Sequence, residues 1–139
     1  MTAADNAKPF AWPIRVYYED TDAQGVVYYA NYFRFMERAR TEWLRALGVD
    51  QRALLNDDRR MFVVTETQAA FVAPARFNDE IVVTAGLAKL GRATFDIEQT
   101  IYRDNLDGPL LLRGTVRAAY IDADTLRPTR VPASLFEEN

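Results

Sequence analysis

The sequence predicts an α+β fold in which a curled antiparallel sheet of five or six strands wraps around one long central helix. Two observations carry this prediction. Apolar residues recur at helical spacing between residues 32 and 47, and the chain beyond residue 60 shows strand patterns. One long apolar helix can fill the concave face of a sheet that curls around it. The 139 residues show no repeat and no second domain, so we expect an N-terminal tail at residues 1–12 and one domain over residues 13–139.

The first expected element is a strand that begins at Pro13, because apolar and more polar residues alternate from Ile14 to Glu19. A turn-rich stretch, residues 20–25, follows. Asn31 is the expected N-cap of a helix from Tyr32 to Leu47, which Gly48 would end. On its polar side, Arg38 and Glu42 have the i,i+4 spacing of an ion pair.

The remaining elements are expected to be strands, because β-branched and aromatic residues dominate each segment and turn residues separate them. A closing helical turn is expected near the C-terminus. The expected strands are Met61–Ala73, Glu80–Leu90, Phe95–Ile101 and Leu110–Ile121, and the turn is 132–136.

The face of the sheet turned away from the helix is expected to bind a second subunit. On the last two strands this face would carry four residues that are too apolar for a wet surface. A monomer with scattered apolar surface residues is the alternative. The four residues are Thr94, Tyr102, Leu111 and Ile121.

Composition excludes several kinds of chemistry. The chain has no Cys and no His, which rules out disulfides, Cys nucleophiles and the Ser-His-Asp triad. A net charge of −3 argues against nucleic-acid binding. No apolar run reaches the length of a membrane helix, and the N-terminus lacks the apolar stretch of a signal peptide, so we expect a cytoplasmic protein.

The candidate site is the connection between the first strand and the helix. A helix N-terminus offers unsatisfied amides that can polarise a carbonyl, and Asp22 lies just upstream with Gly25 to let the backbone turn or approach a ligand. A carboxylate beside such an amide is a minimal acyl-transfer apparatus. From spacing alone, an Asx-turn or a cap is the more common explanation of such an aspartate. A calcium loop is excluded, because Gln24 and Asn31 stand where ligands would be needed.

The residues of this connection carry a family resemblance. The stretch 18–32, YEDTDAQGVVYYANY, followed by FMERAR at 35–40, resembles the signature of the 4-hydroxybenzoyl-CoA thioesterase family of hot-dog proteins. Within that family the Tol-Pal-associated acyl-CoA thioesterases look nearest. The stretches 71–76 and 122–132 also resemble their counterparts, so the resemblance runs from about residue 14 to residue 136.

The resemblance implies a hot-dog fold, subunits that pair into dimers or a homotetramer built as a dimer of dimers, and roles for specific residues. Asp22 matches the catalytic carboxylate, as nucleophile or general base. Tyr29 stands where a backbone N–H polarises the thioester carbonyl, and Asn31 would begin the helix. Many Tol-Pal-associated members have His where this chain has Tyr29. Glu37 matches an acidic family position, although an ion pair with a neighbouring arginine such as Arg38 or Arg40 would also explain it.

The coenzyme A phosphates are expected near the turn at residues 89–92. Family members bind them close to this turn, so Arg92 is the first candidate and Lys89 the second. Solvated turn charges are the alternative. Together with Gly25, these two cations form the expected substrate-binding set.

The sequence therefore predicts hydrolysis of an acyl-CoA to free acid and CoA, without a metal or a separate cofactor because CoA is part of the substrate. Acyl carrier protein stays open as an alternative thiol carrier. A non-catalytic acyl-thioester or partner-binding module is the main alternative function, and a hydratase is disfavoured because it would need a His. The acyl group is undetermined. Its pocket could be lined by Tyr28, Phe33, Phe62 and Phe71.

Overall fold

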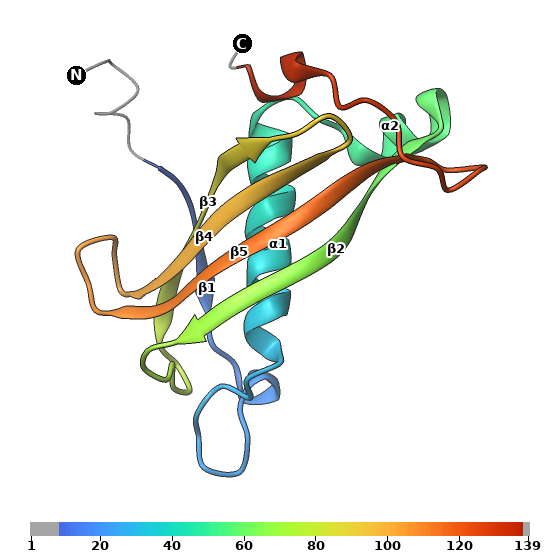
Figure 1. The fold of residues 1–139 in the computed structure, drawn as a ribbon. Coiled ribbons are helices and arrows are strands. Elements are labelled where there is room, and N and C mark those ends of the chain that lie inside the picture. Colours follow the sequence, from blue (N-terminus) through green and yellow to red (C-terminus); the bar gives the residue numbers. More distant parts are fainter. Residues whose placement is uncertain (1–8, 138–139) are drawn as a thin grey trace, which may run out of the picture.

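One five-stranded sheet curls around a long helix in the computed structural model, which describes residues 9–137 (Figure 1). Every neighbouring pair of strands is antiparallel, and the spatial order is β1-β3-β4-β5-β2. The predicted architecture is confirmed with five strands. They are β1 (Phe10–Arg15), β2 (Arg60–Phe71), β3 (Glu80–Leu90), β4 (Thr94–Arg103) and β5 (Leu110–Asp122).

The long helix α1 (Asn31–Ala46) lies against the inner face of the sheet, one residue earlier than the predicted range. Its buried residues are those of the helical repeat: Tyr32, Phe35, Met36, Ala39, Trp43 and Leu44. At 1.5 Å per residue the helix is about 24 Å long. Its two ends are therefore well separated, and residues beside opposite ends cannot contact one another within one chain.

The start of α1 differs from the prediction. Ala30 occupies the N-cap position and makes no side-chain cap, and Asn31 is the first helical residue. The Asn31 side-chain amide donates to the Asp20 carbonyl oxygen at 2.9 Å. The predicted capping role of Asn31 is therefore wrong, because its side chain ties the helix to the preceding loop instead.

Strand β1 begins and ends earlier than predicted. It starts at Phe10, which pairs with Ala85 of β3 and packs against the core. The strand therefore extends into the expected tail, of which residues 1–8 lie outside the described part of the chain. It ends at Arg15, because the chain then enters a 3-10 turn at Tyr18–Asp20. The Tyr18 side chain is 76% exposed and does not continue the alternating pattern.

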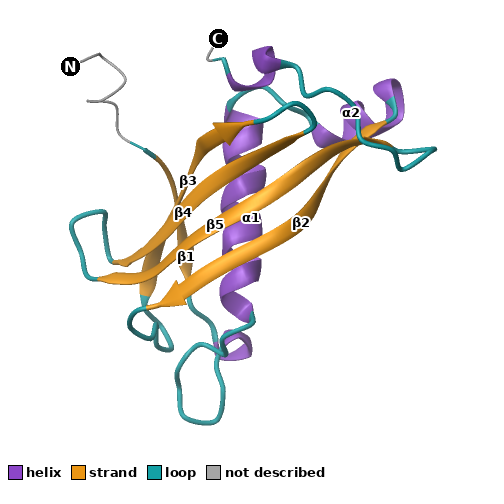
Figure 2. Cartoon of the chain, viewed as in Figure 1, coloured by secondary structure: helices purple, strands orange, loops and turns teal. Residues whose placement is uncertain are grey.

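A short second helix, α2 (Gln51–Asp58), was not predicted from the sequence (Figure 2). Asp50 caps it, because one carboxylate oxygen accepts from the N–H groups of Arg52 and Ala53. The helix buries no residue completely, so its sequence shows little apolar periodicity. The closing turn predicted at the C-terminus is present as the 3-10 helix Ala133–Phe136.

The expected apolar outer face does not form. Leu111 and Ile121 are only 1% and 8% exposed. The pairing register of β4 and β5 shifts between Ile101 and Tyr102, and this bulge leaves Leu111 in the core cluster. Ile121 is bridged to Pro128 of the C-terminal segment, which covers it. The outer face therefore gives no argument for a second subunit.

A buried hydrogen bond ties α1 to the loop beyond β2, and it gives a stability prediction. The Ala75 N–H donates to the Tyr32 hydroxyl at 2.9 Å, and Tyr32 is 4% exposed. Tyr32→Phe leaves that N–H without an acceptor, so we expect a loss of about 1–3 kcal/mol in the free energy of unfolding, measured with urea. Tyr120→Phe is the control, because its hydroxyl bonds to no other described residue, and it should change stability by less than about 0.5 kcal/mol. Equal losses in both variants would contradict this role of the Tyr32 hydroxyl.

Candidate active site

The connection between β1 and α1 forms a tight hairpin that presents Asp22. Thr21 bridges Val27 across it, and the Asp22 N–H donates to the Val26 carbonyl oxygen at 2.9 Å. Gly25 has a φ of +80°, a conformation that side-chain-bearing residues rarely adopt. A Cβ would meet no atom there, since nothing lies within 4 Å of its position. It is therefore the backbone conformation, and not a lack of space, that favours glycine at position 25.

The hairpin is anchored to the segment that follows β2. The Val27 N–H donates to the Ala75 carbonyl oxygen at 2.9 Å, and the Phe77 N–H donates to the Gly25 carbonyl oxygen at 3.0 Å. Val26 also bridges Arg76. These main-chain bonds fix the hairpin against a segment about fifty positions away along the chain.

The two aspartates of the connection have different roles. Asp20 is buried, and its carboxylate accepts from the Tyr17 N–H at 2.8 Å. Its carbonyl oxygen accepts from the Tyr28 N–H at 3.0 Å as well as from the Asn31 side chain. Asp20 is therefore a structural residue that joins the hairpin to the helix start.

Asp22 is exposed and only partly engaged. Its Oδ1 accepts from the Gln24 N–H at 2.8 Å, so the Asx-turn weighed in the sequence analysis is present. Its Oδ2 has no hydrogen-bond donor among residues 9–137. One carboxylate oxygen thus orients the side chain, and the other is left without a donor in the described part of the chain.

At the helix start some main-chain N–H groups are bonded and the N–H of Tyr29 is not. The N–H groups of Asn31 and Tyr32 donate to the carbonyl oxygens of Tyr28 and Tyr29. Within the described part of the chain, the Tyr29 N–H has no acceptor. Tyr29 lies two positions before the first residue of the 16-residue helix α1, near its positive end, where a polarised carbonyl oxygen would be stabilised.

Exposed aromatic side chains gather beside this amide. The Phe71 ring lies 6.4 Å from the ring of Tyr29 and 6.4 Å from that of Phe33. The rings of Tyr28 and Tyr29 are 4.9 Å apart, and a hydrogen bond to Tyr29 raises the pKa of the Tyr28 phenol. Phe62, also considered as a pocket residue, packs instead against Phe95 and Tyr120 in the core.

The ion pairs predicted on α1 are not formed. Glu37 is exposed and has no ion pair among the residues described, and Glu42 pairs with Arg45 instead of Arg38. Arg40 is half-buried and donates to the Gln99 side chain at 3.1 Å. Burial lowers the pKa of the Arg40 guanidinium.

The predicted phosphate-binding cations lie at the other end of the molecule. Lys89 and Arg92 flank the turn between β3 and β4, near the C-terminal end of α1, whereas the Asp22 hairpin lies at its N-terminal end (Figure 1). The structure thus brings Asp22, Gly25 and Tyr29 together and leaves the two cations apart from them.

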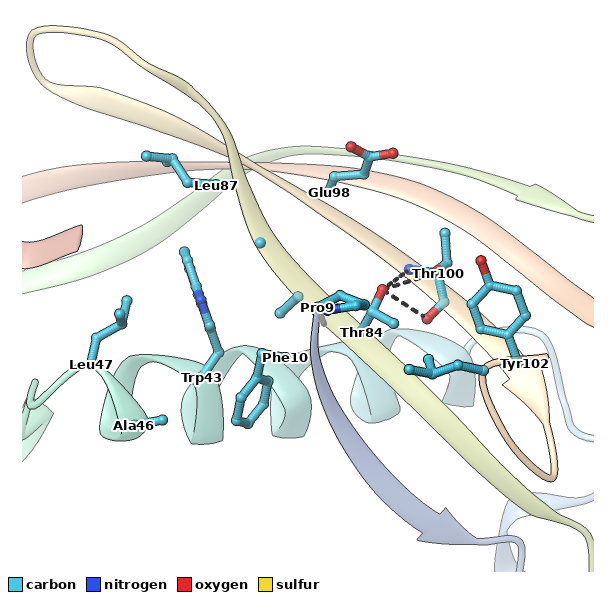
Figure 3. A pocket seen from close by; sticks show the side chains of 13 residues that line it. Pro9, Phe10, Trp43, Ala46, Leu47, Thr84, Leu87, Glu98, Thr100 and Tyr102 are labelled. Carbon is cyan, nitrogen blue, oxygen red and sulfur yellow. Dashed lines mark hydrogen bonds between the residues drawn. The ribbon is translucent and has the colours of Figure 1, made fainter. Parts of the chain in front are cut away.

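Among several hollows around the C-terminal half of α1 and the turn after β3, two are relevant to the predicted site. One, of about 830 Å³, lies between the C-terminal half of α1 and β3 and contains none of the predicted site residues; Trp43 and Leu47 form part of its wall (Figure 3). The other, of about 650 Å³, adjoins Arg92 and also includes Arg130. Arg130 was not predicted as a site residue, although it lies in the stretch 122–132 that resembles the family.

Two kinds of feature are absent from residues 9–137. No group of three or more acidic side chains is placed to hold a metal ion. None of the helices described there is long and apolar enough to cross a membrane.

A protein-family model described as the thioesterase-like superfamily matches residues 16–138. The chain belongs to this family. Acyl-CoA thioesterase YbgC of Haemophilus influenzae is 40% identical over 123 residues, which are 88% of each chain. Acyl-CoA thioester hydrolase YbgC of an Escherichia coli strain is 38% identical over 133 residues, 96% of this chain and 97% of the relative. These relatives confirm the predicted class of enzyme, a thioester hydrolase.

Solved structures of thioesterase-like proteins confirm the hot-dog fold. A probable thioesterase from Bartonella henselae superposes with a TM-score of 0.82 at 31% identity, over 90% of this chain and all of the other. A 4-hydroxybenzoyl CoA thioesterase mutant complexed with 4-hydroxybenzoyl CoA gives a TM-score of 0.84 at 21% identity, over 93% and 96% of the two chains. The second likeness concerns the fold alone.

Proposed function

We propose that this member of the thioesterase-like superfamily hydrolyses acyl-CoA to free acid and CoA, with Asp22 as its reactive carboxylate. The observation that supports this most directly is that both required groups lie in one loop. Asp22 Oδ2 has no donor among the described residues, and the open Tyr29 N–H follows seven positions later at the helix start. A carboxylate and a carbonyl-polarising amide are the two groups that thioester hydrolysis needs.

In the proposed reaction the thioester carbonyl oxygen accepts a hydrogen bond from the Tyr29 N–H. Negative charge grows on that oxygen as the carbonyl is attacked, and the amide and the helix end stabilise it. One such donor contributes about 100- to 1,000-fold in rate. The Tyr29 side chain is not required for this role, so His at this position is not needed.

Two routes for Asp22 lead to the same products. As a nucleophile, the carboxylate forms a mixed anhydride and expels the CoA thiolate, and water then hydrolyses the anhydride. As a general base, it takes a proton from the attacking water while the thiolate leaves, and the thiolate is protonated to the thiol. Neither route uses a metal or a separate cofactor.

The proposed enzyme is a dimer, or a dimer of dimers, that pairs through β2. This strand of 12 residues bonds to β5 on one side, and no other described strand pairs with its second edge. Val64 and Phe71 on it are 47% and 50% exposed. An open, partly apolar edge of this length favours pairing with another strand. A two-fold axis there reverses the second chain, so that the Arg92 end of one chain lies toward the Asp22 end of the other.

A panel of acyl-CoAs with thiol detection tests the function. The panel should contain aromatic, short and long acyl groups, because the ring cluster around Phe71 offers contacts to either aromatic or aliphatic groups. We expect release of CoA from at least one of these substrates. Binding without hydrolysis across the panel would favour the non-catalytic module. Acyl carrier protein thioesters belong in the same assay. We propose a cytoplasmic location for the enzyme.

A further inference from the structure

Residues 74–79 lie between β2 and β3 and join the two halves of the candidate site. Ala75 is fully buried, and its N–H donates to the Tyr32 hydroxyl of α1 at 2.9 Å. The carbonyl oxygen of Ala75 accepts from the Val27 N–H of the hairpin at 2.9 Å. One residue therefore contacts both the helix and the hairpin that presents Asp22. Its position sets how the hairpin lies against the start of the helix.

An ion pair ties this segment to the sheet. The Arg103 guanidinium, at the end of β4, donates through Nε to Asp79 Oδ2 at 3.2 Å and through Nη2 to the Pro74 carbonyl oxygen at 2.8 Å. The same Asp79 oxygen accepts from the Arg76 N–H at 2.9 Å. The two charged side chains thus bond to the main chain of the residues on either side of Ala75.

This ion pair is shielded from water. The side chains of Arg103 and Asp79 are 29% and 23% exposed, whereas those of the ion pair between Arg59 and Asp124 are 48% and 60% exposed. Solvent and salt screen a partly buried pair less than an exposed one. A planar guanidinium that bonds to two acceptors also fixes direction as well as distance. The pair is therefore suited to hold the segment in one position.

We propose that Asp79 and Arg103 are positioning residues for the hydrolysis. Their ion pair holds Ala75 in place and thereby sets the Asp22 carboxylate against the Tyr29 N–H. This inference rests on the proposed function, because it concerns the same site. Neither charged side chain needs to touch the substrate. A shift of about 1 Å between reacting groups costs up to about 100-fold in rate, so an ion pair outside the site can control turnover.

The first measurement is kcat and KM of Arg103→Met for an acyl-CoA that the unchanged protein hydrolyses. We expect kcat to fall by about 10- to 100-fold with KM within about threefold, because the substrate contacts remain and only the reacting groups move. Arg103→Lys should restore part of kcat. Its ammonium group keeps the charge beside Asp79 but lacks the planar fork that bonds to two acceptors.

The Asp22→Asn background separates positioning from stability. A purely structural ion pair would lower the fraction of folded enzyme, so its loss would reduce the residual turnover of Asp22→Asn by the same factor as that of the unchanged protein. If the pair acts through the Asp22 carboxylate, Arg103→Met should lower this residual turnover by less than about twofold. Arg117→Met is the matched control, because Arg117 pairs with Asp96, seven positions from Arg103 along β4. It should leave kcat within about twofold.

Hydrogen exchange tests the positioning role without turnover. The N–H groups of Val27 and Phe77 bond across the contact between the hairpin and residues 74–79. Their exchange should become at least about tenfold faster in Arg103→Met, while amides in the middle of β5 keep their rates. An unchanged kcat in Arg103→Met, or an equal loss of turnover in both backgrounds, would overturn the proposal. If the unchanged protein hydrolyses no acyl-CoA, the proposed function fails, and unchanged exchange at Val27 and Phe77 would then overturn the positioning role as well.

Discussion

Replacing Asp22 by Asn is expected to lower kcat by about two to four orders of magnitude while leaving the affinity for CoA mostly intact. The amide retains an oxygen that can accept from the Gln24 N–H, so the turn of the hairpin should persist. It can neither attack a carbonyl as a carboxylate nor take a proton from water. The measurements are steady-state thioester hydrolysis and CoA binding by calorimetry.

Glu19→Gln is the matched control for this substitution. It removes an exposed carboxylate from the same connection, three positions before Asp22, and should leave kcat within about twofold. Turnover close to that of the unchanged protein in Asp22→Asn would show that another group does the chemistry. A drop in thermal stability confined to Asp22→Asn would point to a structural role.

Activity should reappear when two defective variants are combined in one oligomer. Asp22→Asn lacks the carboxylate, and the double variant Arg92→Ala, Arg130→Ala lacks two positive charges at the end of the molecule where the CoA phosphates are predicted to bind. If one site takes Asp22 from one chain and the arginines from another, a mixed dimer has one intact site of two. Random exchange makes half of the dimers mixed, so kcat/KM for acyl-CoA should reach about a quarter of the unchanged value.

The mixing experiment is done by co-expression with two affinity tags. Random exchange should give about a quarter of the unchanged value, and the purified mixed dimer should give about half. Asp22→Asn combined with the triple variant, which also lacks both arginines, is the control and should show no recovery. If the mixture never exceeds the mean of its two parents, each site uses the carboxylate and the arginines of the same chain. The proposed arrangement across β2 would then be wrong.

Much of the fold follows from local patterns. The spacing of Phe35, Met36, Ala39 and Trp43 marks α1 because a long helix that packs on a sheet must bury one stripe. Helix α2 left no such signal, since none of its residues is buried. The two-residue period of a strand predicts Leu111 on the outer face, and the β-bulge between β4 and β5 interrupts that period.

The candidate site likewise has a part that a local sequence pattern predicts and a part that depends on the folded chain. Asp22, Gly25 and Tyr29 lie within eight consecutive residues, so a short motif could identify them. The meeting of Arg92 with Arg130 depends on how the C-terminal segment folds back along the turn after β3. Phe71 reaches Tyr29 only because β2 ends beside the helix start. Such contacts between distant segments need the register of the whole sheet, which no local pattern contains.

The hairpin that carries Asp22 is held mainly by main-chain atoms, through Val26, Gly25 and Ala75. Side chains at 23 and 24 are exposed and contribute little to its shape. Random substitution at these two positions should therefore yield folded proteins in which the Asp22 carboxylate stays in place. The shape of the loop therefore does not depend on these two side chains, so the sequence at its tip can drift without displacing the carboxylate.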